Sequence, residues 1–287
     1  MMNLPRAVVL EGQSKAILMS AGGTNTQGVW SGYQFCNNNG GGSSCTTTPS
    51  VAATGALMYW TQPNVYVPTG TGAPGCNGST ACGTYVWAGL DSGVGGVYFL
   101  QTGSIGIIRD DLGIQVTNYY LFWEDYESTS SGATLCTGLL NQNLISPGDT
   151  IEPTVTLSSG TSYNLYTKDT TNGNSCTSNP NPYTFSHTPY FEDFIVERGI
   201  WNSVQVHLAK FDTTTIYGQV EWGTTWYPIS RPNGDGWYYQ SLMVNNGVTS
   251  ACAGSWSSGT CSDSVSGGIT AGTWGSFTET WVSSEYT

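Results

Sequence analysis

The sequence predicts an all-β fold of antiparallel strands, arranged as a sandwich or a closed barrel. Short segments rich in β-branched and aromatic residues recur along the chain with turn signals between them. No apolar pattern of helical period persists long enough to predict a helix. Aromatic residues make up 13% of the 287 residues and charged residues only 9%, a composition that favours strands. Many short strands without intervening helices are typical of sandwiches and barrels.

The expected strands combine aromatic or β-branched residues with the polar–apolar alternation of half-buried strands. In the first half of the chain we expect strands at 28–35, 53–63, 83–91, 97–108 and 118–127. In the second half we expect them at 150–157, 163–169, 189–197, 203–211, 215–222 and 275–284. The segments SPGDT, TNGN, NPNP and RPNGDG are turn signals between them. Three long loops are expected, at 36–50, 170–182 and 245–272.

No linker or internal repeat divides this pattern, so we expect one domain over residues 28–287. Residues 1–27 are expected to be an N-terminal extension, either a strand or the remnant of a propeptide. This extension is a poor signal peptide because Glu11 and Lys15 interrupt its apolar run. An export signal upstream, or another export route, would then be needed. No uncharged apolar run approaches the roughly eighteen residues of a membrane span.

The charge balance excludes a nucleic-acid partner and suits an acidic medium. The formal net charge is −12, and only seven Lys and Arg residues are present. A phosphate-binding surface needs clustered basic residues, which this chain lacks. When its carboxylates are protonated in strong acid, those seven residues and two histidines leave at most nine positive charges. Self-repulsion in acid is therefore small, although a merely polar, uncharged surface would have the same composition.

The eight cysteines predict disulfides rather than a metal site. There is no Cys-x-x-Cys pair and only two histidines occur, so we expect no zinc site, no other metal and no cofactor. We expect local pairs in Gly- and Ser-rich stretches and one longer loop, with the pairings Cys36–Cys45, Cys76–Cys82, Cys136–Cys176 and Cys252–Cys261. Disulfides indicate an oxidising compartment, so the protein is expected to be secreted.

The sequence lacks the usual catalytic motifs, so the candidate catalytic residues are carboxylates and amides that lie among aromatic residues. Neither His187 nor His207 has neighbours that form a serine triad, and we expect both to be structural or surface residues. Gln101 lies within the apolar segment VYFLQTGSIGI, where it is either a solvent-facing residue or a catalytic one. A primary amide suits catalysis in acid, because it can donate a hydrogen bond to a developing oxyanion at any pH.

Seven short segments share one chain order with a known family: VWSGY at 29–33, YWTQP at 59–63, VWAGLD at 86–91, LQTG at 100–103, FWEDYE at 122–127, ISPGDTI at 145–151 and DFIVE at 193–197. Together they resemble the glutamic peptidases, or eqolisins, which are secreted endopeptidases that act in acid. The resemblance runs from about residue 28 to residue 284. It implies a concanavalin A-like or jelly-roll-like sandwich of two large antiparallel sheets, whose concave face binds a polypeptide substrate.

The resemblance also implies a mechanism in which Gln101 and a carboxylate activate one water molecule. Substrate-binding residues of the cleft are expected at Trp87, Asp91, Trp123 and Glu124. The catalytic carboxylate is expected at Asp193, where the family has glutamate. Aspartate is one methylene shorter, and a misplacement of about 1 Å can cost about a hundredfold in rate.

Three explanations for Asp193 remain open. Asp193 works from a backbone that sits closer, or Glu192 takes the role through a one-residue bulge, or the site is inactive. An inactive chain would be an extracellular structural protein, for which filament formation is one form of assembly, or a carbohydrate-binding protein whose exposed aromatic residues stack on sugars. Self-assembly is compatible with the uncharged strands but is not implied by them.

Overall fold

The regular elements of this protein are all strands in the part of the chain that its computed structural model describes. The described residues are 24–27, 30–37, 51–68, 76, 81–92, 98–111, 113–126, 134–136, 144–197, 200–201, 204–229, 236–243, 264–266 and 274–281. The prediction of an all-β fold is confirmed. No helix in this described part is long and apolar enough to cross a membrane.

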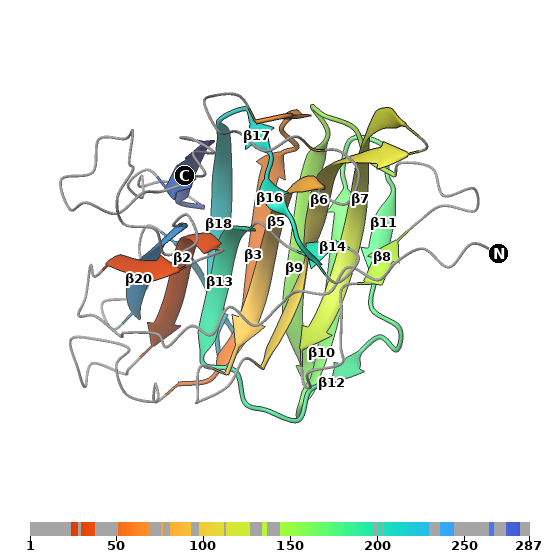
Figure 1. Cartoon of the computed structure of the whole chain (residues 1–287). Coiled ribbons are helices and arrows are strands. Elements are labelled where there is room, and N and C mark those ends of the chain that lie inside the picture. Colours follow the sequence, from red (N-terminus) through yellow and green to blue (C-terminus); the bar gives the residue numbers. More distant parts are fainter. Residues whose placement is uncertain are drawn as a thin grey trace.

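Sheet I is nine-stranded and carries the segments that resemble the catalytic motifs (Figure 1). Its strands, in spatial order, are β1 (Thr24–Gln27), β20 (Gly236–Met243), β2 (Trp30–Asn37), β13 (Phe191–Glu197), β5 (Cys82–Asp91), β6 (Phe99–Asp111), β7 (Ile114–Tyr126) and β8 (Thr134–Cys136), and β16 (His207–Leu208) also pairs with β5. Neighbours are antiparallel except β1 with β20 and β16 with β5. Part of the expected N-terminal extension, Thr24–Gln27, is thus an edge strand.

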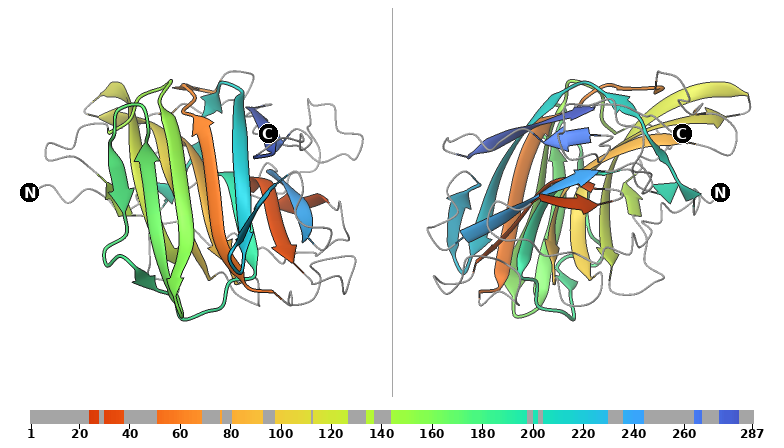
Figure 2. Two further views of the ribbon diagram at one scale, coloured as in Figure 1. Left: turned by 180° about the vertical axis from the view of Figure 1, so that it is seen from behind. Right: turned by 60° about the vertical axis from the view of Figure 1, so that its left-hand side comes forward.

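Sheet II is also nine-stranded and packs behind sheet I; the left view of Figure 2 looks onto it. Its order is β11 (Ser175–Thr177), β10 (Ser162–Asp169), β9 (Thr150–Ser159), β3 (Ala53–Thr61), β18 (Thr214–Trp222), β22 (Ser276–Trp281) and β21 (Ser264–Ser266), with β12 (Tyr183–Thr184) beside β10 and β19 (Thr225–Pro228) beside β18. Two short pairs are separate, β14 (Ile200–Trp201) with β15 (Val204–Gln205) and β4 (Val65–Tyr66) with β17 (Lys210–Phe211). The sandwich alternative is therefore confirmed.

The main core lies between the sheets and is built by strict alternation along each strand. Val86, Ala88 and Leu90 of β5 point inward and join a cluster that includes Met58 and Trp60 of sheet II. Alternate residues of β5 point to the other side, which we call the outer face of sheet I. A slip of one residue in register would exchange the two faces.

The outer face of sheet I carries a second apolar cluster at one end. Its buried members are Ala81, Tyr85, Trp87, Ile105, Ile107, Tyr120, Phe122, Ile195 and Val206. Val206 reaches this face because the segment from β14 to β16 crosses in front of sheet I (Figure 1). β5 is therefore buried on both sides, which explains why Cys82–Leu90 reads as a nearly continuous buried run.

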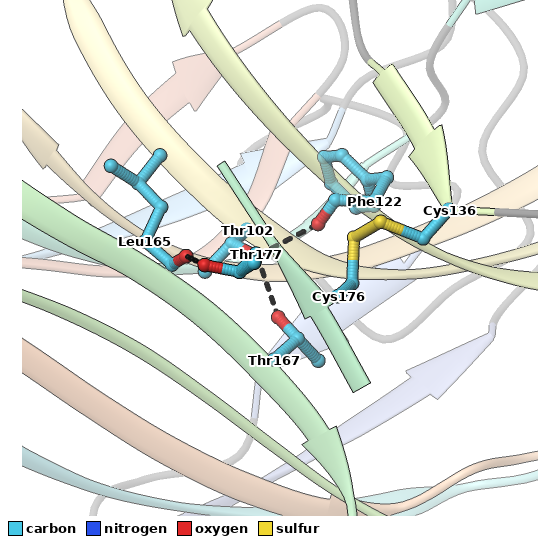
Figure 3. Close-up of a disulfide and its surroundings, with 7 residues drawn as sticks. All are labelled: Thr102, Phe122, Cys136, Leu165, Thr167, Cys176 and Thr177. Atoms are coloured by element: carbon cyan, nitrogen blue, oxygen red, sulfur yellow. Dashed lines mark hydrogen bonds between the residues drawn. A yellow bond between two sulfur atoms is a disulfide. The ribbon is translucent and has the colours of Figure 1, made fainter. Parts of the chain in front are cut away.

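A disulfide and a hydrogen-bonded threonine pair join the two sheets on one side (Figure 3). Cys136 of edge strand β8 is bonded to Cys176 of edge strand β11. Thr102 of β6 donates to the Phe122 carbonyl at 2.7 Å, and its oxygen lies 2.6 Å from the Thr167 hydroxyl of β10. The sandwich cannot open on this side without breaking a covalent bond.

Two predicted disulfides are present in the described residues. They are Cys76–Cys82 and Cys136–Cys176. Cys36 is also disulfide-bonded. Its predicted partner Cys45 and the predicted pair Cys252–Cys261 lie outside the described residues.

Candidate active site

One row of residues crosses the outer face of sheet I and brings the predicted catalytic side chains together. The strand register places the following residues directly opposite one another, in this order: Gln34, Asp193, Gly89, Gln101 and Glu124. Directly opposite residues of antiparallel strands point to the same face. Two strand spacings separate the Cα atoms of Asp193 and Gln101, or about 10 Å.

Gly89 is the residue between them, and it has no side chain of its own. A Cβ atom at this position would lie 2.8 Å from the Leu100 carbonyl oxygen and 2.9 Å from a ring atom of Trp87. The Trp87 ring therefore covers Gly89, and a larger residue at this position would have to displace that ring or the Leu100 backbone.

Gln101 is held by the last residue of the row. Its Nε2 atom donates a hydrogen bond to Oε2 of Glu124 at 2.5 Å. Burial raises the pKa of Glu124 well above its ordinary value, an effect that the Gln101 amide opposes and that the charges of Glu197 and Asp125 reinforce. Glu124 therefore stays protonated to higher pH than an exposed glutamate. Among the described residues, neither Gln101 Oε1 nor Glu124 Oε1 has a hydrogen-bond partner.

Asp193 also contacts a glutamine amide, which comes from Gln34 on the neighbouring strand β2. Gln34 donates from Nε2 to Oδ1 of Asp193 at 2.8 Å, while Oδ2 has no partner in the described part of the chain. Burial raises the pKa of Asp193 well above its ordinary value, the charge of Asp91 raises it further, and the Gln34 amide opposes both. A carboxyl group with a raised pKa can both accept and release a proton nearer neutral pH.

Trp87 and Asp91 lie on the same face as this row, on either side of Gly89 along β5. Trp87 donates from Nε1 to Oε2 of Glu197 at 2.8 Å, and its ring stacks on Phe99 with centroids 6.3 Å apart. Asp91 lies opposite Phe191 and Phe99 and is half-buried. The structure thus places Trp87, Asp91 and Glu124 on the same face as Gln101.

Two of the expected site residues are not brought to this face. β13 pairs with both of its neighbours from Phe191 to Glu197 without a register shift, so the bulge that Glu192 would need is not present. Glu192 points instead into the core between the sheets. Trp123, opposite Thr102, also belongs to that core, with its ring 6.3 Å from Tyr183. Glu192 precedes Asp193 and Trp123 precedes Glu124, and adjacent residues of a strand face opposite sides of the sheet.

Burial is the property of the row that the motifs did not predict. The side chains of Gln101, Glu124 and Asp193 have 0% exposed surface. The open concave cleft expected from the family resemblance is therefore closed over these groups in this structure. A peptide could reach these three side chains only after some of the atoms that cover them move.

Sequence reasoning missed Gln34 as a member of the site. Gln34 directly follows the VWSGY motif, and it lies two residues after Gly32, so the two residues point to the same face of the strand. This signal could not be used without knowing that β2 lies beside β13. Glu197 ends the DFIVE motif, but its bond to Trp87 depends on a contact between strands distant in sequence.

Comparison with known proteins gives a family and similar folds. The model of the Peptidase A4 family matches residues 37–230. The crystal structure of scytalido-glutamic peptidase with a transition state analog inhibitor superposes with a TM-score of 0.55 at 16% identity, covering 92% of this chain and 100% of that one. The same enzyme with a peptide-based transition state analog gives 0.54 at 15% identity, with the same coverage.

Aspergilloglutamic peptidase from Aspergillus niger gives a TM-score of 0.46 at 21% identity, over 70% of this chain and 99% of that one. A search of curated protein sequences gave no match. At these identities the structural matches show the fold alone, and the family rests on the family model, which spans more than half of the chain. The predicted class, a peptide hydrolase, is supported. The chain belongs to the peptidase A4 family, and the predicted kinship with the glutamic peptidases is confirmed.

Proposed function

We propose that this protein is a secreted, acid-tolerant endopeptidase that hydrolyses peptide bonds with Gln101, Asp193 and one activated water. The observation that carries this proposal is the row on sheet I. Gln101 and Asp193 share a face, only Gly89 separates them, and each has a buried oxygen without a partner among the described residues. Buried polar atoms without partners are uncommon and need an explanation, which one water donating a hydrogen bond to each of the two oxygens would provide.

In the proposed reaction, ionised Asp193 accepts a proton from the water molecule, and the oxygen of this water attacks the scissile carbonyl carbon. The Gln101 amide carries two N–H groups, of which one is donated to Glu124 and the other stabilises the oxyanion. The carbon–nitrogen bond then breaks as protonated Asp193 gives its proton to the leaving amine. Glu124, kept neutral by burial, holds the amide without adding a negative charge beside the oxyanion.

Acid tolerance and secretion are supported by different features. The row contains acids whose pKa values are raised, so protonation in acid removes little favourable charge interaction. The disulfides favour an oxidising compartment.

A second candidate is a catalytically inactive sandwich of the same fold. One observation favours it, namely the complete burial of Gln101 and Asp193. A structural or sugar-binding protein would need no access to these groups.

Cleavage of an unfolded protein substrate decides between the two, measured from about pH 2 to about pH 7, a range that begins below the ordinary carboxyl pKa values and ends above them. Pepstatin is added to silence contaminating aspartic peptidases. We expect wild-type activity within this range, rising with pH as Asp193 ionises, and losses of roughly 10²- to 10³-fold in Gln101→Ala and roughly 10²- to 10⁴-fold in Asp193→Asn. Gln219→Ala on sheet II is the matched control and should retain activity. No cleavage by the wild type at any pH, or equal activity of all variants, would reject the proposed peptidase.

A further inference from the structure

Gln34 stands at the start of the row and contacts the proposed catalytic acid directly. It lies on β2, opposite Asp193 of β13, and its half-buried side chain donates to Oδ1 at 2.8 Å. The other side of Gly89 repeats this order, with Gln101 donating to Glu124. The row thus contains two amide–acid pairs, one on each side of the glycine.

The position of Gln34 determines which oxygen of Asp193 is free. β2 and β5 flank β13 on opposite sides. An amide on β2 therefore occupies the carboxyl oxygen that is directed away from Gly89. The second oxygen, Oδ2, has no partner in the described residues and is left for the Gly89 side. The terminal torsion of aspartate is broad, so a hydrogen bond to one oxygen is needed to fix the plane of the group.

We propose that Gln34 is a positioning residue that holds the Asp193 carboxyl group in the orientation and the ionised state that the reaction requires. This inference rests on the proposed function, because Asp193 is the acid–base group only if the chain is a peptidase. It explains how a side chain one methylene shorter than glutamate remains usable. β13 has no bulge against either neighbour, so the proposed gain lies in a fixed orientation of the side chain.

Several acidic groups surround Asp193, and the Gln34 amide opposes their effect on its pKa. Asp91 faces it from β5, Glu197 shares its face on β13, Glu124 lies beyond Gln101, and Glu192 is adjacent on the opposite face. Burial and the charge of Asp91 both favour the protonated acid, whereas the Gln34 hydrogen bond favours the carboxylate. Removal of this donor should therefore make Asp193 harder to ionise.

A carboxyl ¹³C NMR titration of the full chain tests the inference without requiring activity, with Asp193→Asn used to assign the signal. In Gln34→Leu, which keeps the bulk and removes the donor, the pKa of Asp193 should rise by about one pH unit. The low-pH limb of the kcat/KM profile should move upward by the same amount while KM stays nearly constant. Gln34→Glu, a second variant of nearly equal size, should raise the pKa further because it adds a like charge.

Gln219→Leu is the matched control and should move neither the titration nor the pH profile. An Asp193 pKa that is unchanged in both Gln34 variants would overturn the inference, since a merely structural glutamine would alter only stability. If the pKa shifts but the wild type cleaves nothing, the hydrogen bond stands as a structural contact, while both the dyad and the positioning role are rejected. If the pKa and the activity limb shift together, both proposals are supported.

Discussion

The two faces of sheet I bury polar side chains in different arrangements. On the inner face, Thr102 is bonded to Thr167 and Ser104 donates to Gln62 at 2.6 Å, so these hydroxyls tie the chain to itself. Glu192 is the exception on that face, because neither of its carboxyl oxygens has a partner in the described structure. On the outer face, Gln101 and Asp193 each keep an oxygen without a partner among the described residues. An unmet buried polar atom costs about 1–3 kcal/mol. The inner face thus has one isolated unmet acid, whereas the outer row brings unmet oxygens from two strands together and has hydrogen-bonding capacity left for a ligand.

Gly89→Ala should have the largest effect on activity, because it adds a side chain to the outer row. In Gly89→Ala the new Cβ meets the Leu100 carbonyl oxygen at 2.8 Å and a Trp87 ring atom at 2.9 Å, so it must displace Trp87 or the backbone beside the two proposed catalytic groups. We expect a loss of activity of about a hundredfold or more, since displacements of about 1 Å have that effect. Overpacking should also lower the unfolding free energy by about 1–3 kcal/mol.

Gly218→Ala is the matched control from the core side. There the Cβ would lie 2.8 Å from a ring atom of Phe194, between the sheets. We expect a similar loss of stability in denaturant unfolding with nearly full kcat/KM under folding conditions. Equal losses of activity in the two variants would contradict the assignment of the site to the outer face.

The buried acid of the inner face should make stability depend on pH. The pKa of Glu192 is raised well above its ordinary value, first by burial and then by the charge of Asp193. As pH rises above the ordinary glutamate pKa of about 4.3, the unfolded chain loses this proton before the folded one does. Folded stability attributable to Glu192 therefore falls with rising pH, by up to about 1.4 kcal/mol per pH unit, until the raised pKa is passed.

Glu192→Gln removes this dependence and should be more stable than the wild type near neutral pH. The difference should shrink in acid, where both side chains are neutral. Urea unfolding at several pH values measures it, with Glu152→Gln on sheet II as a partly exposed control. A constant difference across the pH range would show that Glu192 does not titrate differently in the folded and unfolded chain.

Thr167→Val tests the inner-face bonds and should have a smaller effect. It removes the hydroxyl that pairs with Thr102, while Thr102 keeps its bond to the Phe122 carbonyl. We expect a loss of about 1 kcal/mol in unfolding free energy. kcat/KM should not change, and a large kinetic defect would mean that the inner face takes part in the reaction.

An effect on substrate affinity alone is expected at Glu197, which accepts a hydrogen bond from Trp87 beside Gly89. Glu197→Leu removes the acceptor for the indole N–H, and we expect KM to rise by up to about tenfold, equivalent to about 1.4 kcal/mol. Glu197→Gln retains an acceptor oxygen and should restore most of the lost affinity. Failure of the glutamine variant to restore KM would show that the charge of Glu197, rather than the position of Trp87, matters.

Alternation along single strands explains what could be predicted from the sequence. The motif at 193–197 gave Asp193 as the partner of Gln101, and the register places both in one row. The same period of two could have excluded Trp123, because its neighbour Glu124 was already expected on the outer face. The contact of Gln34 with Asp193 and the burial of the row could not be predicted, since they depend on which distant strands become neighbours and on what covers the sheet.

The bond between Cys136 and Cys176 bears on how a peptide hydrolase resists cleavage by its own copies. Proteolysis acts on extended chain, which an edge strand exposes when it peels away from its sheet. On this side of the sandwich the edges of the two sheets are the three-residue strands β8 and β11, which are bonded to each other. The bond limits fraying from this side, so we expect it to reduce the extended chain that one copy offers to another.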